Sequence, residues 1–130
     1  MKQRILVVED QADSRRIMRD LLASAGFEVL EATSGREGVE MAARERPDLI
    51  LMDLQLPVID GLEATRQIKA DPGMQATPVI AVTSYALSGD NEKAMAAGCD
   101  GYFSKPVSPR ELLAKIKTVL AGTDSAEPGT

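Results

Sequence analysis

Residues 47–61, PDLILMDLQLPVIDG, decide the fold of this chain. Four consecutive apolar residues stand at positions 49–52, whereas a strand with one face in solvent would alternate apolar and polar side chains. Such a run is typical of a strand in a parallel sheet that helices cover on both faces. The run ends at Asp53, and the pair Asp60-Gly61 predicts a turn that aims the loop after Asp53.

Short apolar runs of the same kind recur along the chain and alternate with helical patterns. They predict strands over residues 5–8, 27–30, 49–52, 79–82 and 102–103. Apolar residues at helical spacing predict helices over residues 17–25, 34–42, 62–68, 88–97 and 108–120, of which the fourth has few large apolar residues. Five strand–helix units indicate an α/β fold, in which right-handed crossovers place helices on both faces of a parallel sheet.

Capping and stop signals mark the ends of several of these helices. Ser34 with Glu37, and Ser108 with Glu111, match the capping-box pattern at two helix starts. Glycine and proline predict where helices end, and the expected stops are Gly26, Asp71-Pro72-Gly73 and Gly98.

The composition fits one globular domain. The chain has 130 residues, of which 44% are hydrophobic and 27% charged. We expect the domain over residues 1–122 and a flexible tail over residues 123–130, where TDSAEPGT is polar. The formal net charge of −5 disfavours direct binding to nucleic acid. The start of the chain lacks a signal-peptide core or a membrane span, so we expect a cytoplasmic protein without membrane contact.

Histidine is absent from the chain, and Cys99 is its sole cysteine. These counts exclude serine–histidine triads, histidine-ligated zinc and intramolecular disulfides. They also exclude the chain as a donor of phosphohistidine, so any phosphohistidine must come from another molecule. We expect Cys99 to be a small core residue.

Polar residues gather where the predicted strands end. In a parallel sheet these carboxyl ends meet at one edge, and ligands bind there at the point where the strand order reverses. Any one of these residues alone is common in turns and caps, but four segments together indicate a site. The residues are, in chain order, Glu9, Asp10, Asp53, Thr83, Ser84 and Lys105.

Three carboxylates at one edge repel one another, and a hard cation relieves that repulsion. Mg²⁺ prefers oxygen ligands and is commonly held by one or two carboxylates together with phosphate oxygens. We expect Asp10, Asp53 and the backbone carbonyl of Gln55 to bind it, with Glu9 acting directly or through water. Asp53 is the favoured nucleophile because the following loop presents it, and a carboxylate can form an aspartyl phosphate.

Two further groups suit the phosphoryl oxygens. Lys105 offers a point charge and the Thr83 hydroxyl offers a hydrogen bond, and we expect Ser84 beside it to bind phosphate as well. Tyr102 is either an ordinary half-buried aromatic residue with its hydroxyl at the surface or part of a switch.

Four segments, ILVVED, LILMDLQLPVIDGLEATRQIK, PVIAVTSYA and GYFSKPVSPRELL, resemble the receiver domains of bacterial response regulators. The resemblance covers about residues 4–120 and is strongest to stand-alone receivers of the DivK kind. It implies the CheY-like, flavodoxin-like (βα)5 fold, doubly wound, with strand order 2-1-3-4-5. It further implies a cis peptide bond between Lys105 and Pro106, which X-Pro chemistry permits.

The resemblance also implies roles for the site residues. It makes Glu9 and Asp10 the acidic pair for Mg²⁺, Asp53 the phosphoacceptor and Lys105 the phosphate-binding lysine. Thr83 and Tyr102 match the switch pair of the family, in which the aromatic side chain turns inward as the hydroxyl moves toward the phosphoryl group. Side chains at the positions of Gln55 and Tyr85 tune the loss of phosphate in the family.

The implied function is that of a signalling switch. The donor is a sensor histidine kinase or a histidine phosphotransfer protein, and the chain catalyses its own aspartyl phosphorylation and slow dephosphorylation. A downstream protein partner is expected on the face formed by the fourth helix, fifth strand and fifth helix, because the sequence holds no output domain after Leu120.

Three alternatives stay open on the sequence alone. A flavodoxin-like ligand binder has this architecture, but it favours a glycine- or serine-rich phosphate loop where this chain has Glu9-Asp10-Gln11. A hydrolase resembling haloacid dehalogenases usually has a second aspartate where this chain has Gln55. A pseudo-receiver would lack some of the chemical positions, all of which are filled here.

Overall fold

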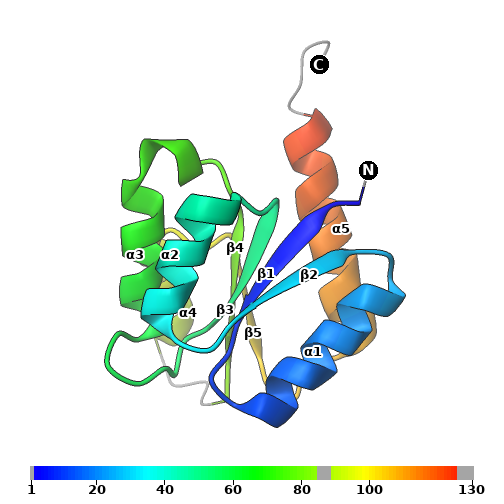
Figure 1. Cartoon of the computed structure of the whole chain (residues 1–130), viewed down its shortest axis with the longest axis horizontal. Helices are drawn as coiled ribbons and strands as arrows, with labels where there is room; N and C mark the ends of the chain where they lie inside the picture. The colour runs from blue at the N-terminus through cyan, green and yellow to red at the C-terminus, as the bar shows by residue number, and fades with distance from the viewer. Residues whose placement is uncertain (1, 85–88, 126–130) are drawn as a thin grey trace.

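A computed structural model describes residues 2–84 and 89–125 of the chain. Its five strands form one parallel sheet in the order β2-β1-β3-β4-β5 (Figure 1). The predicted α/β fold and the strand order implied by the receiver resemblance are therefore confirmed. The strands are β1 (Arg4–Val8), β2 (Glu28–Ala32), β3 (Leu49–Asp53), β4 (Val79–Thr83) and β5 (Gly101–Ser104).

Helices cover both faces of this sheet. Helices α1 and α5 lie on one side, and α2, α3 and α4 lie on the other (Figure 1). The helices are α1 (Ala12–Ser24), α2 (Gly35–Glu45), α3 (Gly61–Ala70), α4 (Asp90–Ala97) and α5 (Pro109–Ser125), with a short 3-10 helix at Pro72–Met74. Helix α5 ends five residues later than predicted and takes up the first part of the predicted tail, whose residues 126–130 lie outside the described residues. Ser88, the predicted start of the fourth helix, also lies outside them.

The core consists of two apolar layers, one on each face of the sheet. Successive residues of β1 alternate between these layers, because side chains of a strand point to opposite faces. Leu6 and Val8 pack toward α2, α3 and α4, whereas Ile5 and Val7 pack toward α1 and α5. Both faces of the central strands are buried, as the continuous apolar runs predicted.

The cap at the start of α2 differs in one bond from the predicted capping box. The Ser34 hydroxyl accepts the Glu37 backbone N–H at 3.1 Å, as that motif requires. The Glu37 carboxylate, however, accepts the backbone N–H of Thr33 at 2.6 Å, one residue before the N-cap. At the start of α5 the Ser108 hydroxyl accepts the Glu111 N–H at 3.3 Å, as predicted.

Glycines end two helices where the sequence predicted. Gly26, just after α1, and Gly98, after α4, have φ angles of 97° and 109°, which residues with a Cβ atom rarely adopt. Helix α3 ends before Asp71, as expected, and the chain turns through the 3-10 helix. Cys99 is buried with its sulfur 3.9 Å from the Thr65 hydroxyl, which confirms it as a core residue.

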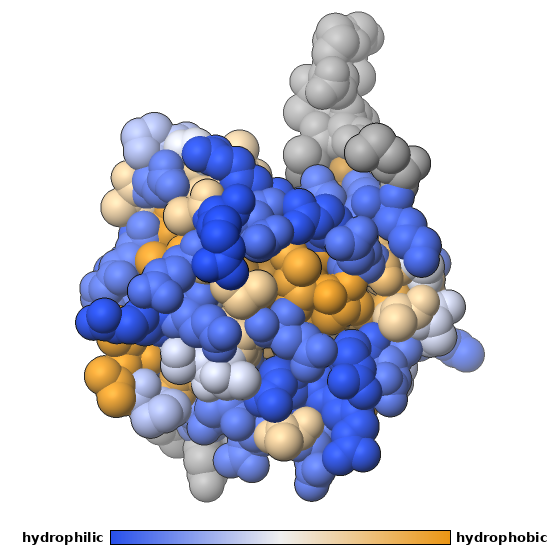
Figure 2. Space-filling view, in the orientation of Figure 1, coloured by the Kyte–Doolittle hydropathy of each residue, from blue (hydrophilic) through white to orange (hydrophobic). Residues whose placement is uncertain are grey.

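Strand β2 forms one edge of the sheet and ends two residues later than predicted. Its backbone pairs with β1 as far as Ala32, although the apolar run ends at Leu30. Figures 1 and 2 show the molecule in the same orientation, with β2 toward the viewer. In this view Figure 2 shows apolar surface between the helices of the two layers. Among the described residues no helix has both the length and the apolar character that crossing a bilayer requires, and the cytoplasmic location stays a prediction.

Candidate functional site

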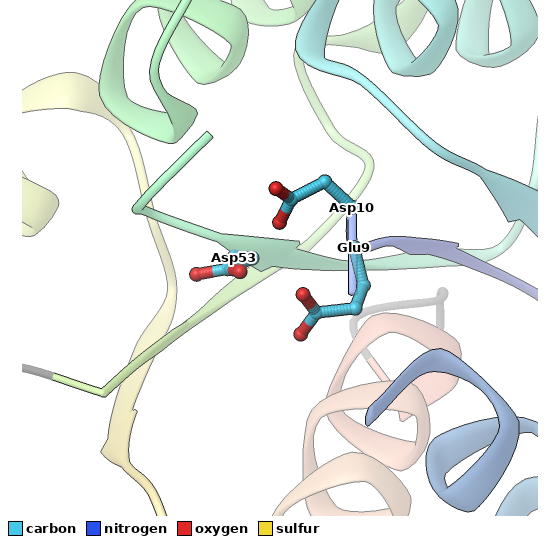
Figure 3. Close-up of side chains that lie close together, drawn as sticks. All are labelled: Glu9, Asp10 and Asp53. Carbon is cyan, nitrogen blue, oxygen red and sulfur yellow. The ribbon is translucent and has the colours of Figure 1, made fainter. Parts of the chain in front are cut away.

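The acidic residues predicted from the sequence meet at the carboxyl end of the sheet. Glu9 and Asp10 follow β1, and Asp53 is the last residue of the neighbouring strand β3. One carboxylate oxygen from each lies within 4.8 Å of the others (Figure 3). Chain connections leave this pair of strands in opposite directions, because β1 leads to β2 on one side while β3 leads to β4 on the other. The site therefore lies at the topological switch point of the sheet.

Lys105 reaches this acidic cluster from the far side of β4. Its Nζ donates a hydrogen bond of 2.5 Å to Glu9 Oε1 and lies 3.8 Å from Asp53 Oδ2. The backbone N–H of Lys105 donates to the carbonyl of Thr83 at 2.7 Å. The peptide bond between Lys105 and Pro106 is cis, as the resemblance implied. The structure thus brings the predicted ammonium group into contact with two of the three predicted acids.

The loop after β3 holds Asp53 from two sides. Asp53 Oδ1 accepts the backbone N–H of Gln55 at 3.0 Å. Gly61, the first residue of α3, donates its N–H to the Leu54 carbonyl at 3.1 Å. A Cβ atom at position 61 would lie 2.2 Å from the Asp53 carbonyl oxygen, so only glycine fits. Asp60 caps α3 by accepting the Glu63 N–H at 2.8 Å, and the pair Asp60-Gly61 fixes the loop as a helix start.

Burial and charge shift the two buried acids in opposite directions. Burial raises the pKa of Asp53 to about 7, and the neighbouring Glu9 adds to that rise. Burial would also raise the pKa of Glu9, but hydrogen bonds from Lys105 and from the Gln11 N–H outweigh it and hold that pKa below its ordinary value. Glu9 is therefore the anion of the pair near neutral pH, and Asp53 binds a proton readily when no cation is present.

Thr83 and Ser84 lie beside Asp53 at the end of β4. Val82 is the strand partner of Asp53, so Thr83 stands one residue beyond it on the adjacent strand. Thr83 is buried, whereas Ser84 is exposed. A cavity of about 390 Å³ opens at this edge and is lined by Asp10, Gln11, Ser14, Asp53, Gln55, Ser84 and Lys105.

Tyr102 on β5 is half-buried and packs against the core layer beneath α2, α3 and α4. Its hydroxyl oxygen is buried, which contradicts the alternative that places the hydroxyl at the surface. Thr83 and Tyr102 lie on adjacent strands, since Ala81 is the strand partner of Tyr102. Tyr85 lies outside the described residues.

The sequence reasoning missed Arg15, whose guanidinium donates to the Glu9 carbonyl at 2.9 Å. It also missed Gln11 and Ser14, which line the cavity. Their position within six residues of the acidic pair was the available signal, because a loop and the first turn of a helix after β1 must border the same edge.

Comparison with known proteins assigns the chain to a family. The family model described as "Response regulator receiver domain" matches residues 5–117. The chain belongs to this family. It is 41% identical over 120 residues to the polar-differentiation response regulator DivK of Brucella anthropi, a match that covers 92% of this chain and 98% of that one. The family also sets aside the flavodoxin-like binder and the hydrolase as alternatives.

Solved receiver structures superpose closely on this receiver. The receiver domain of a sensor histidine kinase from Pseudomonas aeruginosa, with a magnesium ion coordinated in its active site cleft, has a TM-score of 0.87 at 38% identity. The alignment covers 93% of this chain and 99% of that one. The chemotaxis protein CheY4 of Vibrio cholerae has a TM-score of 0.86 at 28% identity, covering 92% and 99% of the two chains.

The acidic cluster of this receiver has the donors that magnesium requires. Its three carboxylates offer hard oxygen ligands from two adjacent strands, and no softer sulfur or imidazole ligand stands among them. Burial is the main cause of the raised pKa of Asp53 and Glu9 adds to it, so a cation beside these carboxylates would favour the ionised form of Asp53. Glu9, Asp10 and Asp53 therefore fit a divalent cation.

Proposed function

We propose that this receiver accepts a phosphoryl group on Asp53 from the phosphohistidine of a sensor histidine kinase or a histidine phosphotransfer protein. The observation that carries the proposal is the convergence of three chain segments on one edge. Lys105 Nζ lies 3.8 Å from Asp53 Oδ2, and the oxygens of Glu9, Asp10 and Asp53 lie within 4.8 Å of one another. A nucleophile, a cation site and an ammonium group are together the parts that phosphoryl transfer needs.

The transfer forms one bond and breaks one. An ionised Asp53 oxygen attacks phosphorus as the bond between phosphorus and the donor imidazole nitrogen breaks, and the imidazole leaves with that electron pair. Glu9, Asp10, Asp53 and the Gln55 carbonyl would hold Mg²⁺, which when bound neutralises charge on the phosphoryl oxygens. Lys105 exchanges its bond with Glu9 for a phosphoryl oxygen, and Thr83 and Ser84 bind the remaining oxygens.

The new phosphoryl group signals through the protein rather than through a diffusing product. Thr83 moves toward the phosphoryl oxygens, and Tyr102 on the adjacent strand responds to the vacated space. The outcome is read by a protein partner on the face of α4, β5 and α5. Slow hydrolysis of the aspartyl phosphate resets the switch, and Gln55 at the cavity wall limits access of the attacking water.

Phosphoramidate tests the proposal directly, because it contains the same phosphorus–nitrogen bond as phosphohistidine. Intact-mass spectrometry should detect one added phosphoryl group on the wild type with Mg²⁺ present and none after EDTA. The Asp53→Asn variant should remain unmodified, whereas the control Asp13→Asn, which removes a highly exposed acid on α1, should react like the wild type. Modification that persists in Asp53→Asn or in EDTA would refute the proposal.

A further inference from the structure

Arg15 lies in the first turns of α1, and its side chain turns back to the loop that holds the acidic pair. Its Nη1 donates a 2.9 Å hydrogen bond to the carbonyl oxygen of Glu9. Its Nε lies 3.3 Å from Glu31 Oε1 on the edge strand β2. The side chain of Arg15 is 19% exposed, so these contacts are largely shielded from water. One guanidinium thus joins helix α1, strand β2 and the site loop.

The carbonyl that Arg15 binds belongs to the peptide group between Glu9 and Asp10. On the preceding side the loop is fixed by the sheet, because the Glu9 N–H donates to the Ala32 carbonyl at 3.0 Å. On the following side stands the N-cap Gln11, whose side chain makes no capping hydrogen bond within the described part of the chain. Rotation about the Cα–C bond of Glu9 would turn this planar peptide group and move the Cα atom of Asp10 and its carboxylate with it.

Glu31 holds the guanidinium in this position. Its Oε1 forms an ion pair with Arg15 Nε at 3.3 Å, and its Oε2 lies 3.8 Å from Arg19 Nη1, one helical turn further along α1. Because the planar guanidinium carries several donors in a fixed arrangement, it can bond a carbonyl and a carboxylate at once, which a lysine ammonium does with less directional precision.

We propose that Arg15 is a positioning residue for the magnesium site. It holds the peptide between Glu9 and Asp10 in the orientation that brings the Asp10 carboxylate to Glu9 and Asp53. The inference rests on the proposed magnesium site of this receiver. Residues behind metal ligands commonly act in this way, and their removal lowers metal affinity by about 10- to 100-fold.

The positive charge of Arg15 acts in the opposite direction. A guanidinium near the site repels a divalent cation, so removal of its charge alone would strengthen Mg²⁺ binding. Loss of positioning would weaken binding instead. The direction of the change in Kd therefore separates the two effects, and a purely structural role would lower the thermal stability without weakening binding.

Arg16 provides the matched control. It stands next in the chain and pairs at 3.3 Å with Asp13 on its own helix, and its side chain is 62% exposed. Arg16→Gln removes the same charge from the same helix without touching the site loop. Arg15→Lys keeps the charge but loses the arrangement of donors, so it tests positioning without a change in net charge.

The experiment measures the Kd for Mg²⁺ by isothermal titration calorimetry in the wild type and three variants. Arg15→Gln should raise the Kd by about tenfold, and Arg15→Lys should raise it less. Arg16→Gln should leave it equal or slightly lower. In metal-free samples the NMR amide signal of Gln11, which donates to Glu9 Oε2, should shift in Arg15→Gln and stay in place in Arg16→Gln.

The outcomes distinguish the inference from the proposed function. An unchanged or lower Kd in Arg15→Gln overturns the positioning role while the magnesium site stands. Should Arg15→Gln fail to fold by circular dichroism, Arg15→Lys decides the matter by the same criterion. A wild type that binds no Mg²⁺ refutes the magnesium site itself.

Discussion

Asp53 is a buried acid beside a second buried acid, and the environment of each decides which one carries the charge. Lys105 and the Gln11 N–H stabilise the charge on Glu9, whereas burial raises the pKa of Asp53 to about 7. The proposed nucleophile is therefore costly to ionise until a cation binds. The negative charge of ionised Asp53 destabilises the metal-free protein, and the same charge attracts the cation.

Substitution of Asp53 by Asn should stabilise the metal-free protein at pH 8. The folded-state pKa of about 7 exceeds the ordinary value of 3.8, so the folded state binds a proton that the unfolded state releases. Stability from this group is complete below about pH 4 and is lost as the pH rises through 7. Asn avoids that loss, and the gain at pH 8 should be roughly 1–3 kcal/mol, since one pKa unit corresponds to about 1.4 kcal/mol.

Urea denaturation in EDTA at pH 8 and pH 5 measures this difference between Asp53→Asn and the wild type. The gain should be smaller at pH 5. Asp13→Asn, which removes an exposed acid outside the cluster, is the matched control. A gain that grows as the pH falls would contradict the assigned sign.

Val58 illustrates strain at a single residue of the same loop. It is fully exposed, its φ is 67°, and the Ile59 N–H donates to the Pro57 carbonyl at 2.8 Å across it. This is the bond of a γ-turn, and a positive φ is unfavourable for a β-branched residue. No packing of the Val58 side chain offsets that strain.

Val58→Gly should therefore raise the free energy of unfolding by about 1 kcal/mol, because glycine adopts positive φ without a steric penalty. Val58→Ala keeps the Cβ atom and should gain less. Chemical denaturation of both variants measures the order. A stability ranking with Val above Gly would show that the side chain has a stabilising contact in the folded protein.

At the scale of elements, we expect helix α4 to be held less firmly than α3. It has eight residues, its N-cap Gly89 offers no side chain for capping, and Ala94 and Ala97 are the buried residues within its described part, 91–97. Helix α3 in contrast has a capped start and the fully buried Ile68. Large buried apolar side chains are what most stabilise a short helix in a protein.

Amide hydrogens of α4 should therefore exchange with deuterium faster than those of α3. Hydrogen exchange by mass spectrometry or NMR at neutral pH measures both helices in one sample. Equal protection of the two helices would contradict the expectation that α4 opens locally. Local opening of α4 would make this helix the mobile element of the proposed output face, which consists of α4, β5 and α5.

Apolar patterns predicted the five strands and the five α-helices but not the 3-10 helix, and the ends of elements depend on partners elsewhere in the chain. Strand β2 continues past its apolar run to Ala32 because its backbone bonds to β1 decide its length. Glu37 bonds to Thr33 rather than Ser34, a choice that depends on loop geometry. Ala94 and Ala97 are buried on the fourth helix, as the lack of large apolar residues in its sequence indicated, and its weaker hold on the sheet stays a prediction.

At the scale of the whole molecule, the location of the site was predicted from one property of the fold, namely that all strands of the sheet are parallel. Parallel strands place all their carboxyl ends at one edge, so Asp53 and Lys105 were expected together before any contact was known. The partners of two side chains were not predictable, namely the ion pair of Lys105 with Glu9 and the hydrogen bond of Arg15 to the Glu9 carbonyl. Both depend on which strands are neighbours and on side-chain directions that spacing does not encode.

Magnesium should stabilise the entire domain through this one edge. A ligand that binds only the folded state adds about 2.7 kcal/mol at 100 times its Kd. The thermal midpoint of the wild type should rise with Mg²⁺ at pH 8, and that of Asp53→Asn should rise less. With Mg²⁺ present, Asp53→Asn should therefore no longer be more stable than the wild type. Equal responses of both proteins in differential scanning calorimetry would place the cation elsewhere.

Helix α3 begins in contact with the main chain of the residue that reacts. Since even a methyl group at position 61 would overlap the Asp53 carbonyl, every other amino acid is closed to this position. The first residue of α3 is therefore fixed as glycine for reasons of space alone, whatever residues its exposed surface has. In a library of all amino acids at position 61, selected for folded protein, only glycine should therefore be recovered.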